Sequence, residues 1–188
     1  MSAPAILLDR DGVLIENVPE YIRSWSDVHP YPSALTALAE LHRLPYPVVV
    51  ATNQSVVGRG LISLAEANAI NERLVAAIRA EGGRLDAVVM CPHRPEDDCQ
   101  CRKPRPGLLL QAKAALDLDL EGSVLIGDAL EDIQAGLAAG VGRMALVRTG
   151  RGAGQEAEVA RLGLASVFVF DDLAEALRRL VHQPFSAG

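Results

Sequence analysis

Six short apolar runs rich in β-branched residues recur along the chain, at residues 5–8, 47–51, 85–90, 123–126, 143–147 and 166–170. They are continuously apolar rather than alternating, which is the pattern of strands covered by helices on both faces. Between them lie amphipathic stretches with helical periodicity, near residues 33–44, 63–80, 106–117, 130–139 and 172–181. This alternation predicts an α/β protein with a three-layer, doubly wound (Rossmann-like) and mostly parallel sheet.

Local signals define some of the boundaries. Ser63 and Glu66 form a capping box that starts one helix, and Gly82-Gly83 ends it. Pro106 suits the first position of the next helix. The stretch from Gly150 to Gly154 is expected to be a flexible loop, and the tail at residues 183–188 to be frayed.

Residues 15–31 form a long irregular segment, and two interpretations of it stay open. Loops of this length inside a compact domain tend to be functional, which makes Asn17, Glu20 and Tyr21 candidate substrate contacts. The segment is equally consistent with a surface excursion for which Trp25 is the anchor.

Composition limits the function classes. The 188 residues are 49% hydrophobic and 22% charged, which fits a single domain over residues 1–188. A net charge of −6 without a basic face argues against nucleic-acid binding. The chain has no apolar stretch long enough for a membrane span and no signal peptide is visible, so we expect a cytoplasmic monomer without a membrane partner.

Acidic side chains follow the first apolar run directly. Asp9 and Asp11 are separated by one residue and followed by Gly12. Residues two apart on an extended backbone point the same way, so the two carboxylates could address one small site and share a divalent cation. The alternative is a plain turn, because Asp and Gly commonly end strands.

Polar groups also follow two later strands. Thr52, Asn53, Gln54 and Ser55 come after the second, where hydroxyl, amide and backbone N–H groups suit phosphate oxygens, and Arg59 adds a cation. Asp128 and Asp132 follow the fourth, where a helix cap would explain one of them. Since ligands of such sheets bind at the carboxyl ends of the strands, these groups are candidates for one site.

A cysteine-rich loop follows the third strand. Cys91, His93, Cys99 and Cys101 supply the four nitrogen and sulfur ligands of a closed tetrahedral zinc site, which favours a structural zinc ion. Redox thiols are the alternative, but the spacing is not Cys-x-x-Cys. Arg102 and Lys103 follow at once, so the metal-bound loop would fix the direction of two cations.

Together these motifs resemble the haloacid dehalogenase (HAD) superfamily of phosphatases over about residues 5–150. The four stretches that carry the resemblance are, in order, Asp9-x-Asp11-Gly12, Thr52-Asn53-Gln54, Arg102-Lys103-Pro104 and Gly127-Asp128 with Asp132. The loop pattern Cys-x-His-x5-Cys-x-Cys is similar to the small-cap branch that contains the D-glycero-D-manno-heptose 1,7-bisphosphate 7-phosphatases and the histidinol-phosphatases. In the heptose enzymes a lysine often follows the last motif aspartate, where this chain has Ala129.

The resemblance implies a magnesium-dependent phosphatase with a minimal cap. Asp9 would be the nucleophile and Asp11 the acid and base, while Asp9, the carbonyl of Asp11 and Asp128 would bind Mg²⁺. The remaining roles would be phosphoryl stabilisation by Thr52 and Lys103, substrate recognition by Arg102, and support of the metal site or Lys103 by Asp132.

The expected substrate is a phosphorylated sugar, D-glycero-D-manno-heptose 1,7-bisphosphate losing its 7-phosphate, bound by short loops and by Arg59 and Arg102. Histidinol phosphate is the second candidate and would favour acidic residues such as Glu16, Glu20 or Asp97. A third hypothesis, of another class, is a phospho-receiver signalling module, which also uses an aspartate at a strand end. Asp11 and the cysteine loop argue against it, because a receiver needs neither.

Overall fold

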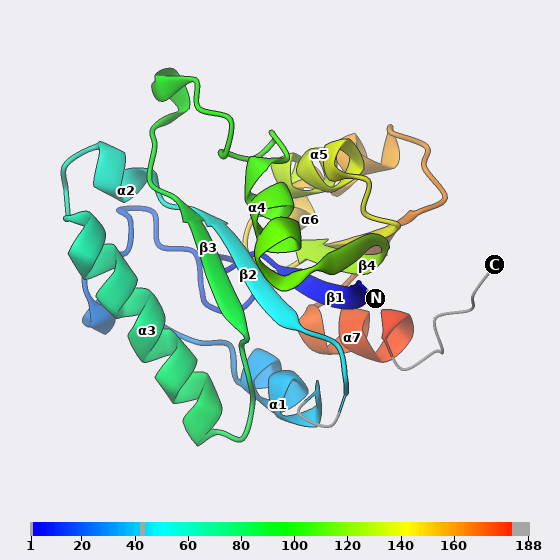
Figure 1. Cartoon of the computed structure of the whole chain (residues 1–188), viewed down its shortest axis with the longest axis horizontal. Coiled ribbons are helices and arrows are strands. Elements are labelled where there is room, and N and C mark those ends of the chain that lie inside the picture. Colours follow the sequence, from blue (N-terminus) through cyan, green and yellow to red (C-terminus); the bar gives the residue numbers. More distant parts are fainter. Residues whose placement is uncertain (1, 42–43, 182–188) are drawn as a thin grey trace.

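The structure is a computed structural model, and it describes residues 2–41 and 44–181. Six strands form one sheet in the order β3-β2-β1-β4-β5-β6, and every neighbouring pair is parallel (Figure 1). The strands are β1 (Ala3–Leu8), β2 (Val48–Asn53), β3 (Ala87–Cys91), β4 (Leu118–Gly127), β5 (Arg143–Val147) and β6 (Val167–Phe170). The expected doubly wound parallel sheet is confirmed.

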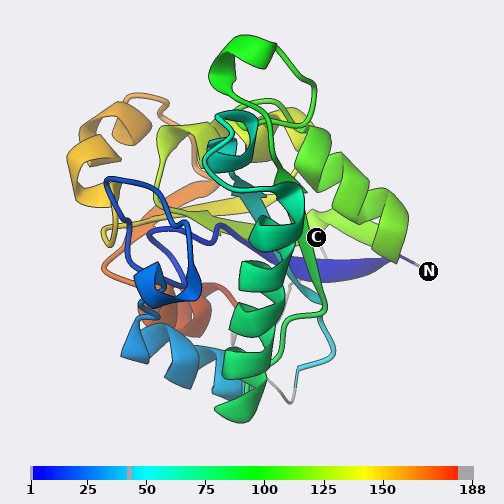
Figure 2. The same cartoon turned by 90° about the vertical axis from the view of Figure 1, so that its left-hand side faces the viewer.

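Helices cover both faces of the sheet and make the three expected layers (Figures 1 and 2). One face carries α1 (Pro32–Glu40), α3 (Leu64–Ala80) and α7 (Leu173–Leu180). The other carries α4 (Gly107–Leu116), α5 (Leu130–Ala139) and α6 (Gly152–Ala160). Short helical turns are η1 (Trp25–Asp27), α2 (Ser55–Gly58) and η3 (Pro95–Asp97). Within the described residues, no helix is both long and apolar enough to cross a membrane.

Strand periodicity divides the core into two clusters. Ile6 and Leu8 of β1 face the α1/α3/α7 layer, whereas Ala5 and Leu7 face the α4/α5 layer. Successive side chains of a strand point to opposite faces, so a strand buried on both sides must be apolar at every position. All four of these residues are 0% exposed.

Sequence signals account for most helix boundaries. The capping box of Ser63 and Glu66 forms as expected, and Gly82 follows the end of that helix with φ +84°. Pro106 precedes the first helical residue rather than occupying it. The first helix was expected over 33–44 but spans Pro32–Glu40, and the predicted frayed tail lies outside the described residues.

Two expectations about local structure were wrong. The stretch Gly150–Gly154 is not a loop throughout, because α6 begins at Gly152. Glycines disfavour a helix intrinsically, but tertiary contacts override that preference here: Val159 is buried, and the Gln155 side chain accepts from the N–H of Leu130 at 2.6 Å. Strand β4 also begins five residues early, because residues from Leu118 onward pair with the start of β1.

The irregular segment at residues 15–31 satisfies both interpretations in part. Its ends are tied together, since the N–H of Glu16 donates to His29 and that of Tyr31 to Leu14. Trp25 packs against the core and lies under the guanidinium of Arg73, at 4.8 Å from its ring centre. This packing fixes the base of the segment, whose early part reaches the cavity described below.

Ser123 provides a test of how β1 and β4 are joined. Its fully buried hydroxyl accepts from the N–H of Ala5 at 2.8 Å and donates to the carbonyl of Asp119. Ser123→Ala leaves a buried N–H without this acceptor, so we expect the free energy of unfolding to fall by about 1–3 kcal/mol in urea denaturation. Ser33→Ala, on the exposed surface of α1, is the control and should change it by less than about 0.5 kcal/mol. Equal values for the two variants would contradict the prediction.

Candidate active site

A cavity of about 680 Å³ opens at the carboxyl edge of the sheet. Strands β1 and β4 are neighbours whose connections run to opposite sides, and such a switch point is the usual ligand site of an open α/β sheet. Eleven of the predicted site residues line this cavity: Asp9, Asp11, Asn17, Tyr21, Asn53, Gln54, Ser55, Arg59, Arg102, Lys103 and Asp132. Thr52 and Asp128 are fully buried and are not among the lining residues.

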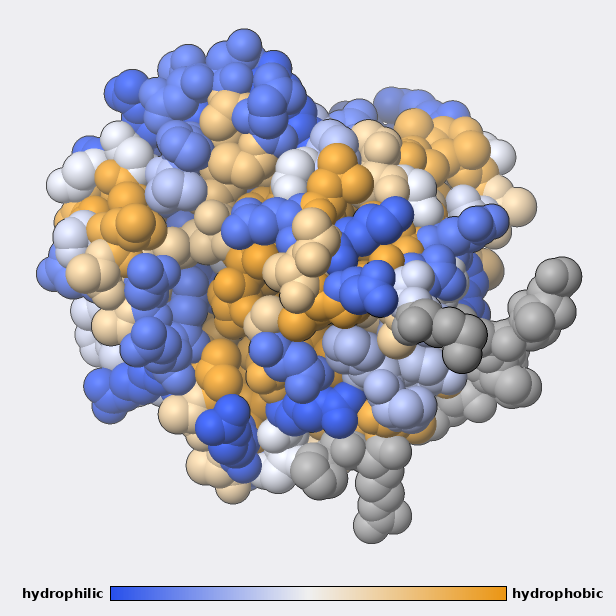
Figure 3. All heavy atoms as spheres, in the orientation of Figure 1, coloured by the Kyte–Doolittle hydropathy of each residue, from blue (hydrophilic) through white to orange (hydrophobic). Residues whose placement is uncertain are grey.

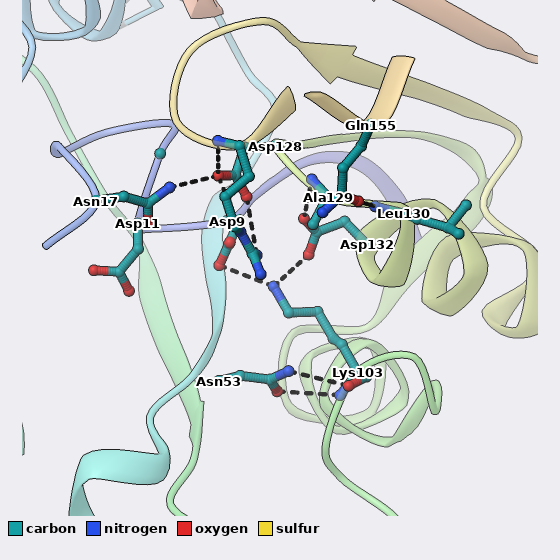
Figure 4. Close-up of polar contacts among 12 residues, drawn as sticks. Asp9, Asp11, Asn17, Asn53, Lys103, Asp128, Ala129, Leu130, Asp132 and Gln155 are labelled. Atoms are coloured by element: carbon teal, nitrogen blue, oxygen red, sulfur yellow. Dashed lines mark hydrogen bonds and ion pairs between the residues drawn. The ribbon is translucent and has the colours of Figure 1, made fainter. Parts of the chain in front are cut away.

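The ammonium group of Lys103 lies at the centre of the site (Figure 4). Its Nζ is 2.8 Å from Asp9 Oδ1 and 2.5 Å from Asp132 Oδ1, and it donates to the carbonyl of Ala51 at 2.8 Å. The side chain is 3% exposed and those of the two acids 7% and 2%. One buried cation therefore holds the end of β1 to the start of α5.

Burial strongly affects the charges of this group. It raises the pKa of Asp9 to about 7, even though Lys103 acts in the opposite direction. Burial alone would lower the pKa of Lys103, but Asp132 and Asp9 raise it above its usual value. Lys103 therefore stays cationic, and Asp9 needs positive neighbours to be a carboxylate at neutral pH.

Asn53 holds the backbone of Lys103 in place. Its Nδ2 donates to the carbonyl of Lys103 and its Oδ1 accepts the N–H of the same residue, both at 3.1 Å. Figure 4 shows the paired contact beneath the lysine side chain. Asn53 also lines the cavity, so its predicted contact with the substrate stays a prediction.

Asp128 is fully buried on the other side of Asp9. Its Oδ2 accepts from Asn17 Nδ2 at 2.7 Å and from the N–H of Arg151 at 2.9 Å, while the Arg151 guanidinium lies 3.2 Å from Oδ1. A Cβ at Gly12 or at Gly150 would come within 2.1 Å or 2.3 Å of this carboxylate, and both glycines have positive φ. The surrounding backbone therefore approaches the acid as closely as only glycine permits.

Asp9, Asp128 and Asp132 offer carboxylate oxygens within 4.8 Å of one another, close enough to hold one metal ion. The set predicted from the sequence shares Asp9 and Asp128 with this group. Because Asp132 already contacts Lys103 and accepts the N–H of Ala129 at 3.1 Å, its carboxylate is committed to that side of the site. Buried oxygen donors of this kind suit Mg²⁺.

Asp11 lies in the cavity but turns away from Asp9 (Figure 4). Its Oδ2 accepts from Gln54 Nε2 at 2.7 Å, and Gln54 also donates to Thr52 Oγ1 at 2.8 Å. The two motif acids were expected to point the same way, but β1 ends at Leu8 and the chain bends at Arg10, between the two acids. Gln54 and Thr52 therefore contact Asp11, whereas the sequence suggested phosphate contacts for them.

Sequence reasoning missed three residues of the site. Arg10 lies 3.1 Å from the Asp11 carboxylate, while Glu131 and Arg151 line the cavity. The single cation between two motif acids was the available signal for Arg10. Arg151 lies within the stretch Gly150–Gly154, for which the sequence predicts a flexible loop, and no local pattern marks it.

The four predicted zinc ligands converge. Distances among the sulfurs of Cys91, Cys99 and Cys101 and the Nδ1 of His93 run from 3.2 to 3.6 Å for the contacting pairs. Burial raises the pKa of Cys91, whereas N–H and thiol donors lower that of Cys99 despite its burial. The loop forms the hydrophilic projection at the top of Figure 3, and the four groups could hold one zinc ion.

The loops at the mouth of the cavity contact one another. Arg59 lies over the ring of Tyr21, 5.9 Å from its centre, and 4.0 Å from Glu96 of the cysteine loop. Arg102 donates to the carbonyl of His93 at 3.3 Å. Ser55, another residue that lines the cavity, is the first residue of α2. Two cations from different loops thus face one opening.

Comparison with known proteins identifies the family. The family model described as HAD-hydrolase-like matches residues 100–176. Over 176 residues the chain is 38% identical to the D-glycero-beta-D-manno-heptose-1,7-bisphosphate 7-phosphatase of Pseudomonas putida, covering 94% of this chain and 98% of that protein. The chain belongs to this family of HAD phosphatases. The Escherichia coli K12 protein of the same name is 38% identical over 84% of this chain and 85% of its own length.

Solved structures agree with this membership. The D,D-heptose 1,7-bisphosphate phosphatase of Bordetella bronchiseptica, complexed with magnesium and phosphate, matches with a TM-score of 0.86 and 39% identity, over 95% of this chain and 98% of that one. The Burkholderia thailandensis enzyme matches with a TM-score of 0.69 and 35% identity, covering 95% and 99%. The predicted superfamily, fold and phosphatase class are confirmed, and the receiver-module hypothesis has no support.

Zinc content provides a test of the cysteine loop. Cys99→Ser removes one of four ligands, so we expect zinc, measured by elemental analysis of the purified protein, to fall from about one ion per chain to well below that. The far-UV circular dichroism should change little, because the sheet has its own core. Gln100→Ser, an exposed neighbour, is the matched control and should keep its zinc. Full zinc content in Cys99→Ser would refute the site.

Proposed function

We propose that this protein removes the 7-phosphate of D-glycero-D-manno-heptose 1,7-bisphosphate with the help of Mg²⁺. The observation that carries the proposal is the identity of 38–39% over nearly the whole chain to proteins of that name. The geometry supports it, because a buried carboxylate paired with a lysine faces a cavity whose mouth carries Arg59 and Arg102.

Asp9, Asp128 and the backbone carbonyl of Asp11 are the proposed holders of Mg²⁺. The buried carboxylate of Asp128 and the close glycines around it support this assignment. A bound magnesium ion would neutralise the charge between carboxylate and phosphate, which would otherwise repel each other. Zinc at the cysteine loop is proposed to be structural, since its four ligands leave no open position.

The proposed role of each reacting group follows from its position in the site. Asp9 attacks the phosphorus and forms an aspartyl-phosphate, while Lys103 remains beside it to balance the charge of the phosphoryl group. Asp11, 25% exposed in the cavity, gives a proton to the leaving alkoxide and later takes one from water. The Thr52 hydroxyl donates to Asp11 Oδ2 at 3.5 Å and helps to hold this carboxylate in place.

Charge at the mouth of the cavity favours a bisphosphate over histidinol phosphate. Arg59, Arg102 and Arg151 all line the cavity and could bind a second phosphate. Of the acids that would suit histidinol phosphate, Glu16 and Glu20 are not among the lining residues and Asp97 pairs with Arg94 at 2.8 Å. Ala129 is fully buried and offers the substrate no cation. We also propose that the protein is a monomer and lies in the cytoplasm.

The two motif acids can be separated kinetically. Asp9→Asn removes the nucleophile and should abolish phosphate release. Asp11→Asn keeps the nucleophile but loses proton transfer, so kcat should fall about 10²- to 10⁴-fold with binding retained. Both are measured as phosphate release at saturating substrate with Mg²⁺ present. Near-normal turnover by Asp9→Asn would rule out the covalent mechanism.

Substrate preference is decided by kcat/KM, measured side by side for the heptose bisphosphate and for histidinol phosphate. We expect the bisphosphate to be preferred by at least tenfold, because cations line the mouth. Arg102→Ala should reduce that ratio, whereas Arg23→Ala, at an exposed residue that does not line the cavity, should leave it unchanged. A tenfold preference for histidinol phosphate would overturn the substrate assignment and leave the chemistry intact.

A further inference from the structure

A buried arginine, Arg10, stands between the two motif acids in the sequence. Arg10 has a side chain that is 3% exposed. Its Nε donates to Asp11 Oδ2 at 3.2 Å and its Nη2 to Asp11 Oδ1 at 3.1 Å. The guanidinium thus binds both carboxylate oxygens in a fork, a geometry that fixes the plane of the carboxylate as well as its position.

Arg10 is itself held from the opposite side by helix α3. Its Nη1 donates to Asn71 Oδ1 at 2.8 Å, and Asn71 Nδ2 lies 3.5 Å from Met90 Sδ of β3. Asn71 is 5% exposed and stands in the apolar stripe of α3 next to Ile70. A buried amide in that stripe needs a polar partner, and its oxygen finds one in the guanidinium.

The position of Arg10 limits what it can do. It is not among the residues that line the cavity, so its charge cannot bind the substrate directly. Asp11 does line the cavity, and its Oδ2 also accepts from Gln54 Nε2 at 2.7 Å. Any effect of Arg10 on the reaction therefore passes through Asp11, the residue that its guanidinium contacts.

We propose that Arg10 and Asn71 are positioning residues that orient the Asp11 carboxyl for proton transfer. The inference rests on the proposed phosphatase chemistry. As the bond from Asp9 oxygen to phosphorus forms and the bond to the leaving oxygen breaks, the Asp11 proton goes to that oxygen. Water then attacks phosphorus and gives its proton to Asp11, which releases Asp9 and inorganic phosphate.

Two substitutions weaken the hydrogen bonds that link Asn71, Arg10 and Asp11, and both are at residues that do not line the cavity. Arg10→Lys keeps the charge but cannot form the fork, because an ammonium group is a point donor. Asn71→Ala keeps the fork and removes its anchor. We expect kcat on the heptose bisphosphate to fall about 10- to 100-fold in Arg10→Lys and about tenfold in Asn71→Ala, within the range for general acid–base catalysis, with KM changed less than twofold.

An aryl phosphate separates positioning from structural damage. The p-nitrophenolate ion leaves without a proton, so the first turnover of p-nitrophenyl phosphate should proceed within threefold of the wild-type rate in both variants. Later turnovers need Asp11 as a base and should slow tenfold or more, with aspartyl-phosphate accumulating in acid-quenched samples. Asn68→Ala, exposed on the same helix, should match the wild type in both phases.

The outcomes separate this inference from the proposed function. If both phases slow together, or if the variants keep wild-type kcat, Arg10 and Asn71 have no positioning role. If wild-type protein hydrolyses p-nitrophenyl phosphate but not the heptose bisphosphate, the substrate assignment fails and the positioning role is tested on the aryl ester alone. If wild-type protein hydrolyses neither, the phosphatase proposal is overturned and the inference with it.

Discussion

The site depends on one buried cation. Lys103 brings its ammonium group between Asp9 and Asp132 in a place almost closed to water, and three oxygen atoms lie within 2.8 Å of its Nζ. Removing one partner of a buried ion pair typically costs about 3–5 kcal/mol, because the remaining charge is left without compensation. Here the loss of the lysine would leave two carboxylates facing each other. The charge beside Asp9, the proposed nucleophile, is therefore also what joins β1 to α5.

Lys103 comes from a loop, which is normally the most mobile part of a fold, yet it is held from two sides. The cysteine and histidine side chains converge immediately before it, and Asn53 binds its backbone N–H and carbonyl from the end of β2. A functional side chain is precise only when its support is rigid. The cysteine loop is thus a support for the active site as well as a lining of its mouth.

The cavity separates two tasks. Asp9 lies just beyond the carboxyl end of a central strand, and the ammonium group of Lys103 reaches it there from its loop. Arg59 and Arg102 lie at the mouth of the cavity, where Arg59 contacts Glu96 and Arg102 contacts the carbonyl of His93. The groups proposed for catalysis thus meet at the edge of the sheet, whereas the cations proposed for substrate recognition lie on loops, whose sequences vary more readily. Arg10 belongs to the first task, because both its partners come from regular elements or their ends.

The sequence by itself determined the sheet, five of the six longer helices after the first strand, the motif acids and the four side chains of the cysteine loop that could hold a metal ion. These features are local, since strand periodicity, helix caps and the residue types at strand ends depend on residues that are close together in the sequence. Only the tertiary structure decided that Asn53 binds Lys103, that Asn17 binds Asp128 and that Arg10 is anchored by Asn71. Those partners lie 50, 111 and 61 residues apart, and nothing in the local pattern specifies which polar groups meet. Helix α6 was missed for the same reason: glycines open it, and its stability comes from packing and from the contact between Gln155 and Leu130.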